Sequence, residues 1–149
     1  MNNIERKLKD EGVTIAVTKG DSMEPMLKSG DIVIVQKPSF PLNVFDIPVY
    51  RREGHLTMHR IVKIINGKYV ICADNRTKLD RDITEKDIVG VLAGYYKNGE
   101  YISLHNNEYI EYCKSLNKNY SARVLTDFCA RIKSKLKNLL KGGCGNEIE

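Results

Sequence analysis

Short β-type segments separated by turn residues fill most of the first 104 positions of this sequence. These runs are rich in Val, Ile and Tyr and are bounded by Gly, Asn, Asp or Pro, which is typical of strands rather than helices. The Asn66–Gly67 pair between two runs predicts a two-residue hairpin turn, because both residues tolerate a positive φ. We therefore expect a mainly β fold with an antiparallel body. The predicted strands are Val13–Thr18, Asp31–Gln36, Ile47–Arg51, Leu56–Ile65, Tyr69–Ala73, Ile88–Tyr96 and Tyr101–Leu104.

The size and composition of the chain are those of a soluble globular protein with one core. It has 149 residues, of which 42% are hydrophobic and 29% are charged. No apolar run approaches the roughly 18 residues of a membrane-spanning helix, and the polar opening segment lacks the apolar stretch of a secretion signal. The four cysteines include no CxxC pair, so we expect reduced thiols, no metal site and no cofactor. These features predict a cytoplasmic protein.

The net charge of +5 comes from the end of the chain. Residues 113–149 contain eight basic and three acidic residues, whereas residues 1–112 contain sixteen of each. Apolar residues recur at three- and four-residue spacing over 121–141, which predicts an amphipathic helix. We therefore divide the chain into a β domain over 1–105 and a basic helical extension over 106–149. The helix over 121–141 has two interpretations: its apolar stripe packs on the β domain, or the helix makes peripheral contact with an anionic membrane.

The segment 20–33 carries the first candidate catalytic residue, Ser22. We expect Ser22 to lie at the end of a predicted strand, with Pro25 and Gly30 shaping the turn that follows. A serine in such a position presents its hydroxyl while neighbouring backbone N–H groups point at an incoming carbonyl oxygen. An isolated Ser-x-x-Pro is more often a helix cap, so a catalytic interpretation of Ser22 needs support from other residues.

That support comes from His59 and from acidic residues that follow it. His59 lies within a predicted strand, and Asp74 and Asp80 come 15 and 21 residues later. A serine hydroxyl becomes a good nucleophile when a neutral base accepts its proton, and histidine, with an ordinary pKa of about 6.5, is substantially neutral at cytosolic pH. A carboxylate that fixes the tautomer of the imidazole completes such a site. Asp31 and Asp46 are instead expected to fix turns at strand ends.

Three segments in this order resemble the motifs of the signal peptidase and S24/S26 serine peptidase superfamily. GDSMEPMLKSGDIVIV is similar to its serine motif, LTMHRIVKI to its general-base motif and CADNRTKLDRD to its acidic motif. His59 followed by Arg60 and Ile61 resembles the endoplasmic-reticulum and archaeal type of signal peptidase, whereas the commoner bacterial type and the LexA-like repressors use a lysine as base. The resemblance covers about Val13 to Gly94 and implies an antiparallel β body of the signal peptidase and LexA type.

The resemblance also implies an activity and the roles of the site residues. Ser22 is the expected nucleophile and contributes its backbone N–H to the oxyanion hole, and His59 is the general base. Asp80 is expected to orient His59, with Asp74 as a supporting carboxylate. The implied activity is that of a serine endopeptidase that cleaves an extended peptide with small side chains near the cut, such as a leader or signal-like segment of a precursor protein. We expect no nucleic-acid partner.

Two alternative functions are open on the same fold. A LexA-like self-cleaving regulator is disfavoured, because only about a dozen residues precede the first predicted strand, too few for a helix-turn-helix domain. A non-catalytic peptide-binding module is disfavoured because Ser22, His59 and Asp80 are all present. Labelling of Ser22 by a serine-reactive phosphonate distinguishes such a module from an enzyme.

Overall fold

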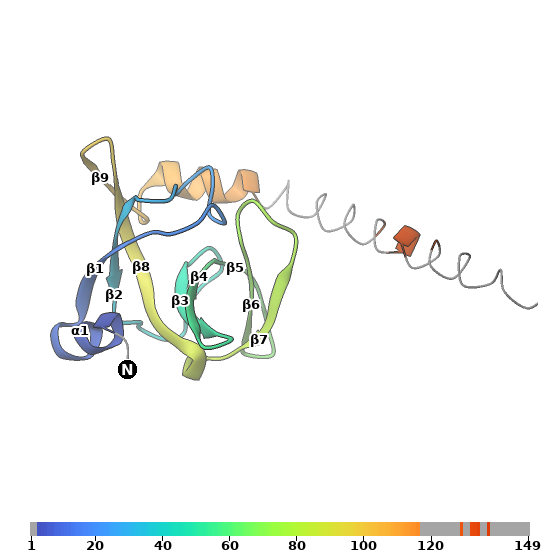
Figure 1. Ribbon diagram of the computed structural model, residues 1–149, viewed down its shortest axis with the longest axis horizontal. Helices are drawn as coiled ribbons and strands as arrows, with labels where there is room; N and C mark the ends of the chain where they lie inside the picture. The colour runs from blue at the N-terminus through green and yellow to red at the C-terminus, as the bar shows by residue number, and fades with distance from the viewer. Residues whose placement is uncertain (1–2, 117–128, 130–131, 135–136, 138–149) are drawn as a thin grey trace, which may run out of the picture.

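Two antiparallel sheets form the body of the protein in the computed structural model, which describes residues 3–116, 129, 132–134 and 137 (Figure 1). The larger sheet has the strand order β1-β2-β8-β3-β4, with β9 also paired to β8, and the smaller sheet has the order β5-β6-β7. A helix over 107–116 follows the last strand, so the predicted mainly β fold class with a C-terminal helical segment is confirmed. The other elements are α1 (Asn3–Glu11), β1 (Val13–Val17), β2 (Ile32–Gln36), β3 (Pro48–Arg52), β4 (His55–Met58), β5 (Arg60–Ile65), β6 (Lys68–Cys72), β7 (Leu79–Ile83), the 3-10 helix η1 (Glu85–Asp87), β8 (Ile88–Lys97) and β9 (Glu100–Ser103).

The structure differs from the sequence prediction at three elements. The predicted strand Leu56–Ile65 is two strands, β4 and β5, which are separated at His59 and belong to different sheets. β7 has the polar sequence LDRDI, which carries no strand signal, and it forms because its backbone pairs with β6. α1 has only Ile4 and Leu8 as apolar residues, one turn apart, and it is stabilised where Leu8 is buried in the core.

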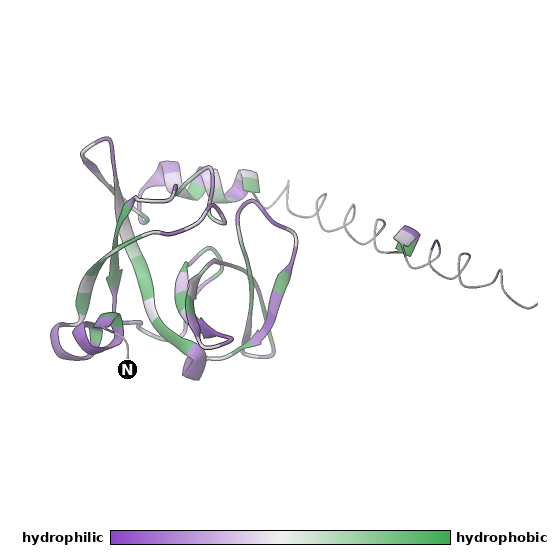
Figure 2. Cartoon of the chain, in the orientation of Figure 1, coloured by the Kyte–Doolittle hydropathy of each residue, from purple (hydrophilic) through white to green (hydrophobic). Residues whose placement is uncertain are grey.

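A large core cluster joins the inner faces of β2 and β8 to α1, to the loop between β1 and β2, and to the helix over 107–116. The long strand β8 is largely hydrophobic, whereas the outer surface of α1 and several turns are hydrophilic (Figure 2). Gly90 in β8 permits the closest packing in this core. A Cβ atom at Gly90 would lie 2.6 Å from Val35 Cγ1 and 2.9 Å from Leu8 Cδ1, so the missing side chain is what lets α1 approach the sheet.

The turns that hold these strands follow local sequence signals. Asn66 and Gly67 have φ angles of 49° and 73° and join β5 to β6, which confirms the predicted hairpin. Asp31 Oδ2 accepts a hydrogen bond from a loop backbone N–H at 2.8 Å, and Asp46 Oδ2 accepts one of the same length. Both aspartates therefore fix turns before strands, as the sequence predicts.

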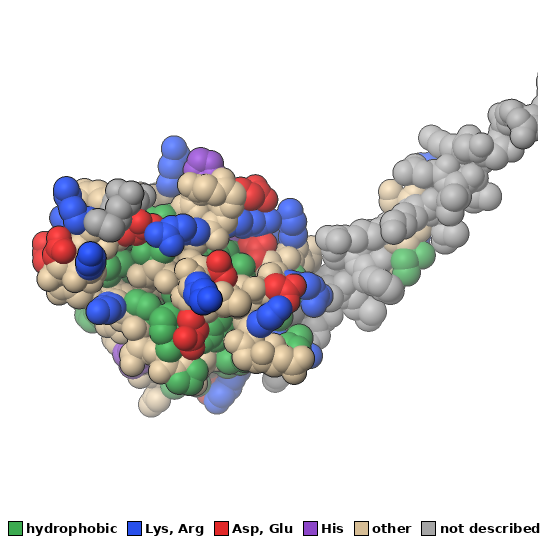
Figure 3. Space-filling model, turned by 90° about the horizontal axis from the view of Figure 1, so that it is seen from below, with side chains coloured by type: hydrophobic (Ala, Val, Ile, Leu, Met, Phe, Trp, Pro, Cys, Tyr) green, Lys and Arg blue, Asp and Glu red, His purple; other side chains and the backbone are tan. Residues whose placement is uncertain are grey.

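The helix over 107–116 is packed on the body through Tyr109 and Cys113, which are both in the large core cluster. The predicted helix over 121–141 lies outside the described residues, apart from 129, 132–134 and 137, so both of its interpretations stay predictions. No helix in the described part of the chain is long and apolar enough to cross a membrane. One face of the body carries basic and acidic side chains interspersed, in keeping with the balanced charge of residues 1–112 (Figure 3).

Candidate active site

Ser22 lies in the loop that connects β1 and β2. The chain leaves β1 at Val17, so Ser22 stands in the following loop rather than at the strand end that the sequence predicts. The loop turns back on itself, with a hydrogen bond from the Leu27 N–H to the Met23 carbonyl at 3.0 Å. It is anchored by the buried side chains of Met23, Met26 and Leu27, which leave Ser22 half-buried beside them. These three buried side chains fix the position of the loop that carries the serine.

Ser22 lines an open cavity of about 250 Å³ whose wall combines apolar side chains with Thr18, Lys19 and Thr57. Thr57 and Met58, the last two residues before His59, line the same cavity. A volume of about 150 Å³ is enough to hold a benzene molecule, so this cavity has room for one side chain of a ligand. Other apolar residues of its wall include Ala16, Leu27, Val33, Val49 and Leu56.

His59 occupies the break between β4 and β5, where the chain passes from one sheet to the other. Its side chain is 13% exposed. Burial lowers the pKa of His59 from its ordinary value of 6.5; the charge of Asp80 opposes this and that of Arg52 adds to it. His59 is therefore neutral at cytosolic pH, which is the state in which it can accept a proton.

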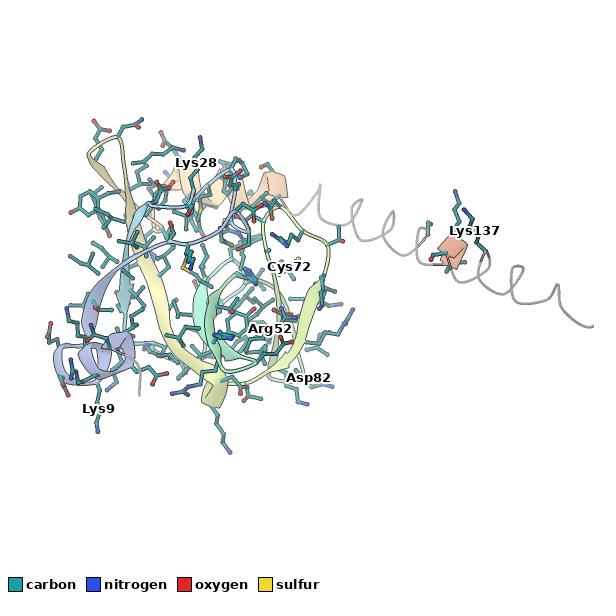
Figure 4. The ribbon with its side chains drawn as sticks, in the orientation of Figure 1. Lys9, Lys28, Arg52, Cys72, Asp82 and Lys137 are labelled. Carbon is teal, nitrogen blue, oxygen red and sulfur yellow. The ribbon has the colours of Figure 1, made fainter. Side chains whose placement is uncertain are left out.

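Asp80 on β7 faces His59 through the hydroxyl of Tyr50. The distance from Asp80 Oδ2 to His59 Nδ1 is 3.8 Å, which is too long for a hydrogen bond. Tyr50 Oη lies 3.0 Å from His59 Nδ1 and donates to Asp80 Oδ2 at 2.5 Å. Arg52 Nη1 completes the cluster, 2.5 Å from Asp80 Oδ1 and 2.7 Å from Oδ2; Figure 4 labels Arg52 in this region. The expected pairing of Asp80 with His59 thus takes an indirect form, with a tyrosine between them.

Asp74 forms a buried ion pair with Arg60, the residue after His59. Arg60 Nε and Nη2 donate to the two carboxylate oxygens at 2.8 and 2.6 Å, and both side chains are 2% exposed. Burial alone lowers the pKa of Arg60, but the hydrogen bonds and charge of Asp74 outweigh burial and raise it. Arg60 Nη1 also donates to Tyr109 Oη and to Cys113 Sγ on the helix over 107–116. Asp74 therefore anchors the framework around the site.

The loop after β6 is tied to the serine loop. The backbone N–H of Asn75 donates to the carbonyl of Ser22 at 3.3 Å, and the side-chain amide of Asn75 donates to the carbonyl of Asp21 at 2.5 Å. Because Asn75 directly follows Asp74, this short loop contacts both the serine loop and the arginine next to His59. Segments that are far apart in the sequence are thereby held around one region of the fold.

Ser22 and His59 are not joined by a hydrogen bond in the part of the chain that the structure describes. Hydrogen bonds between catalytic groups often tighten only when substrate binds, so their absence does not exclude a catalytic role. Among the described residues, the backbone N–H of Ser22 likewise donates to no protein group. Its role in an oxyanion hole stays a prediction.

Tyr50 and Arg52 are the site residues that the sequence analysis misses. Their spacing of two along β3 places them on one face of the strand, but it does not show what that face contacts. Tyr50 pairs with Thr57 of β4, two residues before His59, and its hydroxyl reaches His59 just beyond the end of that strand. Asp80 comes from the other sheet, so the cluster depends on how the two sheets pack.

No group of three or more His, Cys, Asp or Glu side chains within the described residues is placed to hold a metal ion. A protein-family model described as Peptidase S24-like matches residues 3–93, from α1 to the middle of β8. The match includes the loop with Ser22, the break with His59 and the strand with Asp80. No curated protein matches the sequence significantly.

Proposed function

Because the chain belongs to the S24-like peptidase family, we propose that it is a serine endopeptidase that cleaves an extended peptide. In this proposal Ser22 is the nucleophile, His59 the general base and Asp80 the carboxylate that stabilises the protonated base. The use of histidine as base is the feature that the chain would share with the endoplasmic-reticulum and archaeal type of signal peptidase. The family match by itself supports only a peptidase-type or LexA-like protein, so the finer proposal depends on the site.

The observation that carries the proposal is the polar chain from His59 through Tyr50 to Asp80. His59 directly follows Met58, which lines the same cavity as Ser22. A buried, neutral histidine whose second nitrogen is held by a carboxylate-linked hydroxyl is suited to accept a serine proton. Such an arrangement costs desolvation free energy, and perturbed groups of this kind cluster at functional sites.

In the proposed reaction Ser22 Oγ attacks the carbonyl carbon of the scissile bond while its proton passes to Nε2 of His59. The negative charge of Asp80 stabilises the imidazolium that forms, because it raises the pKa of His59 against the effect of burial. The proton then passes to the leaving amine as the C–N bond breaks, which leaves an acyl group on Ser22. A water molecule then gives a proton to His59 and attacks the acyl carbon, and His59 returns the proton to Ser22 Oγ as the ester bond breaks. We expect the Ser22 backbone N–H to bind the oxyanion.

β1 supports the proposal that the substrate is an extended peptide. It pairs with β2 and lies at one end of the strand order of the larger sheet. An extended peptide can add to such an edge through backbone hydrogen bonds, with alternate side chains directed into pockets. Because β1 leads into the serine loop and Ala16 lines the cavity, we propose that the residues next to the cut are apolar.

Self-cleavage of the LexA type is the alternative within the family, and the position of the relevant bond disfavours it. A regulator of that type cuts an Ala–Gly bond of its own, and this chain has one such sequence, Ala93–Gly94. The bond lies within β8, where Gly94 is buried and pairs with Ile34 of β2 and Ser103 of β9. It is a structural part of the sheet, so presenting it to Ser22 requires the sheet to open.

Labelling with a serine-reactive fluorophosphonate, followed by incubation with precursor peptides from the same cell, tests the proposal. We expect the wild-type protein to be labelled at Ser22 and to cleave a precursor, as detected by mass spectrometry. Ser22→Ala should remain folded, since its small side chain contributes little packing, and should lose both activities. Ser29→Ala, a serine of the same loop with an exposed side chain, is the matched control and should keep both. Cleavage by Ser22→Ala at the wild-type rate would overturn the proposed function.

A further inference from the structure

Tyr50 is the most buried member of the polar cluster, with an exposed fraction of 0% on β3. Its hydroxyl is 3.0 Å from His59 Nδ1 and 2.5 Å from Asp80 Oδ2. The tyrosine and imidazole rings meet edge-on, with centroids 6.2 Å apart and an angle of 63° between the planes. Tyr50 thus contacts His59 through both its ring and its hydroxyl, and it is the group between the base and the carboxylate.

The direction of the two hydrogen bonds follows from counting protons. Asp80 is paired with Arg52 through both carboxylate oxygens, and an ionised carboxylate can only accept hydrogen bonds. Tyr50 has a single hydroxyl proton, and burial raises the pKa of Tyr50 above its ordinary value, so the proton is retained. That proton goes to Asp80. The Tyr50 oxygen can then only accept a hydrogen bond from His59.

A neutral imidazole that donates from Nδ1 has its lone pair on Nε2. Nε2 is the nitrogen that acts as general base when Nδ1 is held by an orienting group. We propose that Tyr50 is a positioning residue, which fixes His59 in the Nδ1–H tautomer and connects it to the charge of Asp80. This inference rests on the proposed function insofar as it assigns Tyr50 a part in catalysis; the tautomer itself is a property of the resting protein.

Within the described part of the chain, the charged groups that influence His59 are Asp80, Arg52 and Asp74. The two aspartates raise the pKa of His59, whereas Arg52 lowers it. Arg52 holds Asp80 in a position 3.8 Å from His59 Nδ1, beyond hydrogen-bond distance. If the Tyr50 hydroxyl is removed, His59 loses the acceptor that selects its tautomer, and Asp80 has to move from its present position to replace it.

Nitrogen-15 NMR of the imidazole rings at about pH 8 reads the tautomer directly, without any substrate. The signals of His59 are distinguished from those of His55 and His105 by comparison with His59→Gln. We expect the wild-type ring to be protonated at Nδ1. In Tyr50→Phe, which keeps the aromatic ring, we expect a mixture of the Nδ1–H and Nε2–H forms. A wild-type ring protonated at Nε2 would overturn the inference whether or not the variant folds.

The rate of fluorophosphonate labelling at Ser22 gives the catalytic readout. We expect Tyr50→Phe to be labelled at least about tenfold more slowly than wild type, because loss of the correct tautomer has cost up to about 10⁴-fold in a well-studied triad. Tyr69→Phe is the matched control: Tyr69 is a buried tyrosine of the same core cluster as Tyr50, and its hydroxyl accepts a hydrogen bond from the Leu42 N–H. The Tyr69→Phe protein should lose some stability but keep the wild-type tautomer of His59 and the wild-type rate of Ser22 labelling.

The outcomes separate the inference from the proposed function. If Tyr50→Phe keeps the wild-type tautomer, the inference is wrong, even when labelling slows, because the effect on labelling is then structural. If the tautomer changes but the labelling rate does not, Tyr50 is not a positioning residue for the reaction. If wild-type Ser22 is not labelled at all, the proposed function fails, and the NMR comparison still decides whether Tyr50 selects the tautomer of His59.

Discussion

Replacing Asp74 with alanine is expected to destabilise the fold by about 3–5 kcal/mol, because it leaves the buried guanidinium of Arg60 without its counter-charge. In the structure both side chains are 2% exposed and are joined by two hydrogen bonds of 2.6 and 2.8 Å. The remaining contacts of Arg60 are neutral groups, among them the Tyr109 hydroxyl and the Cys113 thiol. Neutral groups can accept hydrogen bonds but cannot offset the cost of burying a positive charge.

This loss is large on the scale of the whole protein, since domains of this size are stable by about 5–15 kcal/mol. A double variant, Arg60→Met with Asp74→Leu, removes both charges and keeps apolar volume in their place. Replacing a complete buried ion pair with apolar residues is often nearly neutral. We therefore expect the double variant to be more stable than Asp74→Ala, and the effects of Arg60→Met and Asp74→Leu to be strongly non-additive.

Urea unfolding followed by circular dichroism measures these free energies. The control is Lys68→Ala, which breaks the exposed ion pair of Lys68 with Asp82 and should change stability by less than about 1 kcal/mol. A loss below about 1 kcal/mol for Asp74→Ala, or additive effects of Arg60→Met and Asp74→Leu, would refute the reasoning. Labelling of Asp74→Asn across pH adds a second check. If Asp74 only anchors the framework, this variant should lose stability while the pH midpoint of labelling changes little.

Three further predictions concern the site and the tail. Ala16→Leu should fill part of the cavity. It should slow the cleavage of a peptide with a bulky residue at the cut more than it slows the labelling of Ser22 by a small phosphonate. Equal effects on the two rates would argue against a substrate cavity at this position. Burial lowers the pKa of His59 below its ordinary value of 6.5, so the folded protein is destabilised when the histidine is protonated on acidification. Urea midpoints should therefore fall more steeply between pH 6.5 and 5 for wild type than for His59→Gln. Parallel curves for the two proteins would contradict this. Removal of residues 121–149 should spare cleavage of a short peptide and weaken binding to anionic vesicles if the tail is a membrane anchor. Unchanged vesicle binding would reject the anchor interpretation.

Much of the body could be predicted from the sequence because strands and tight turns carry local signals. The alternation in Ile32–Gln36 places Val33 and Val35 on the buried face, and this pattern needs no knowledge of what covers it. Asn66–Gly67 specifies its hairpin through backbone preferences alone. Elements without such a signal are different: β7 forms through backbone pairing with the preceding strand β6, and α1 through burial of Leu8 against parts of the chain far away in the sequence.

The same distinction applies to the candidate site: its residues could be predicted from the sequence, but their contacts could not. Ser22, His59 and Asp80 were accessible from the sequence because ordered motifs resemble those of a known superfamily. The geometry of the site could not be predicted from the sequence, because Tyr50 and Asp80, which meet beside His59, are 30 residues apart and come from different sheets. No local pattern encodes that contact, and none assigns Asp74 to Arg60. The sequence alone determined which residue types are present and in what order, whereas the packing of the two sheets decided which of them lie within hydrogen-bond distance, because hydrogen bonds form only over a few ångströms.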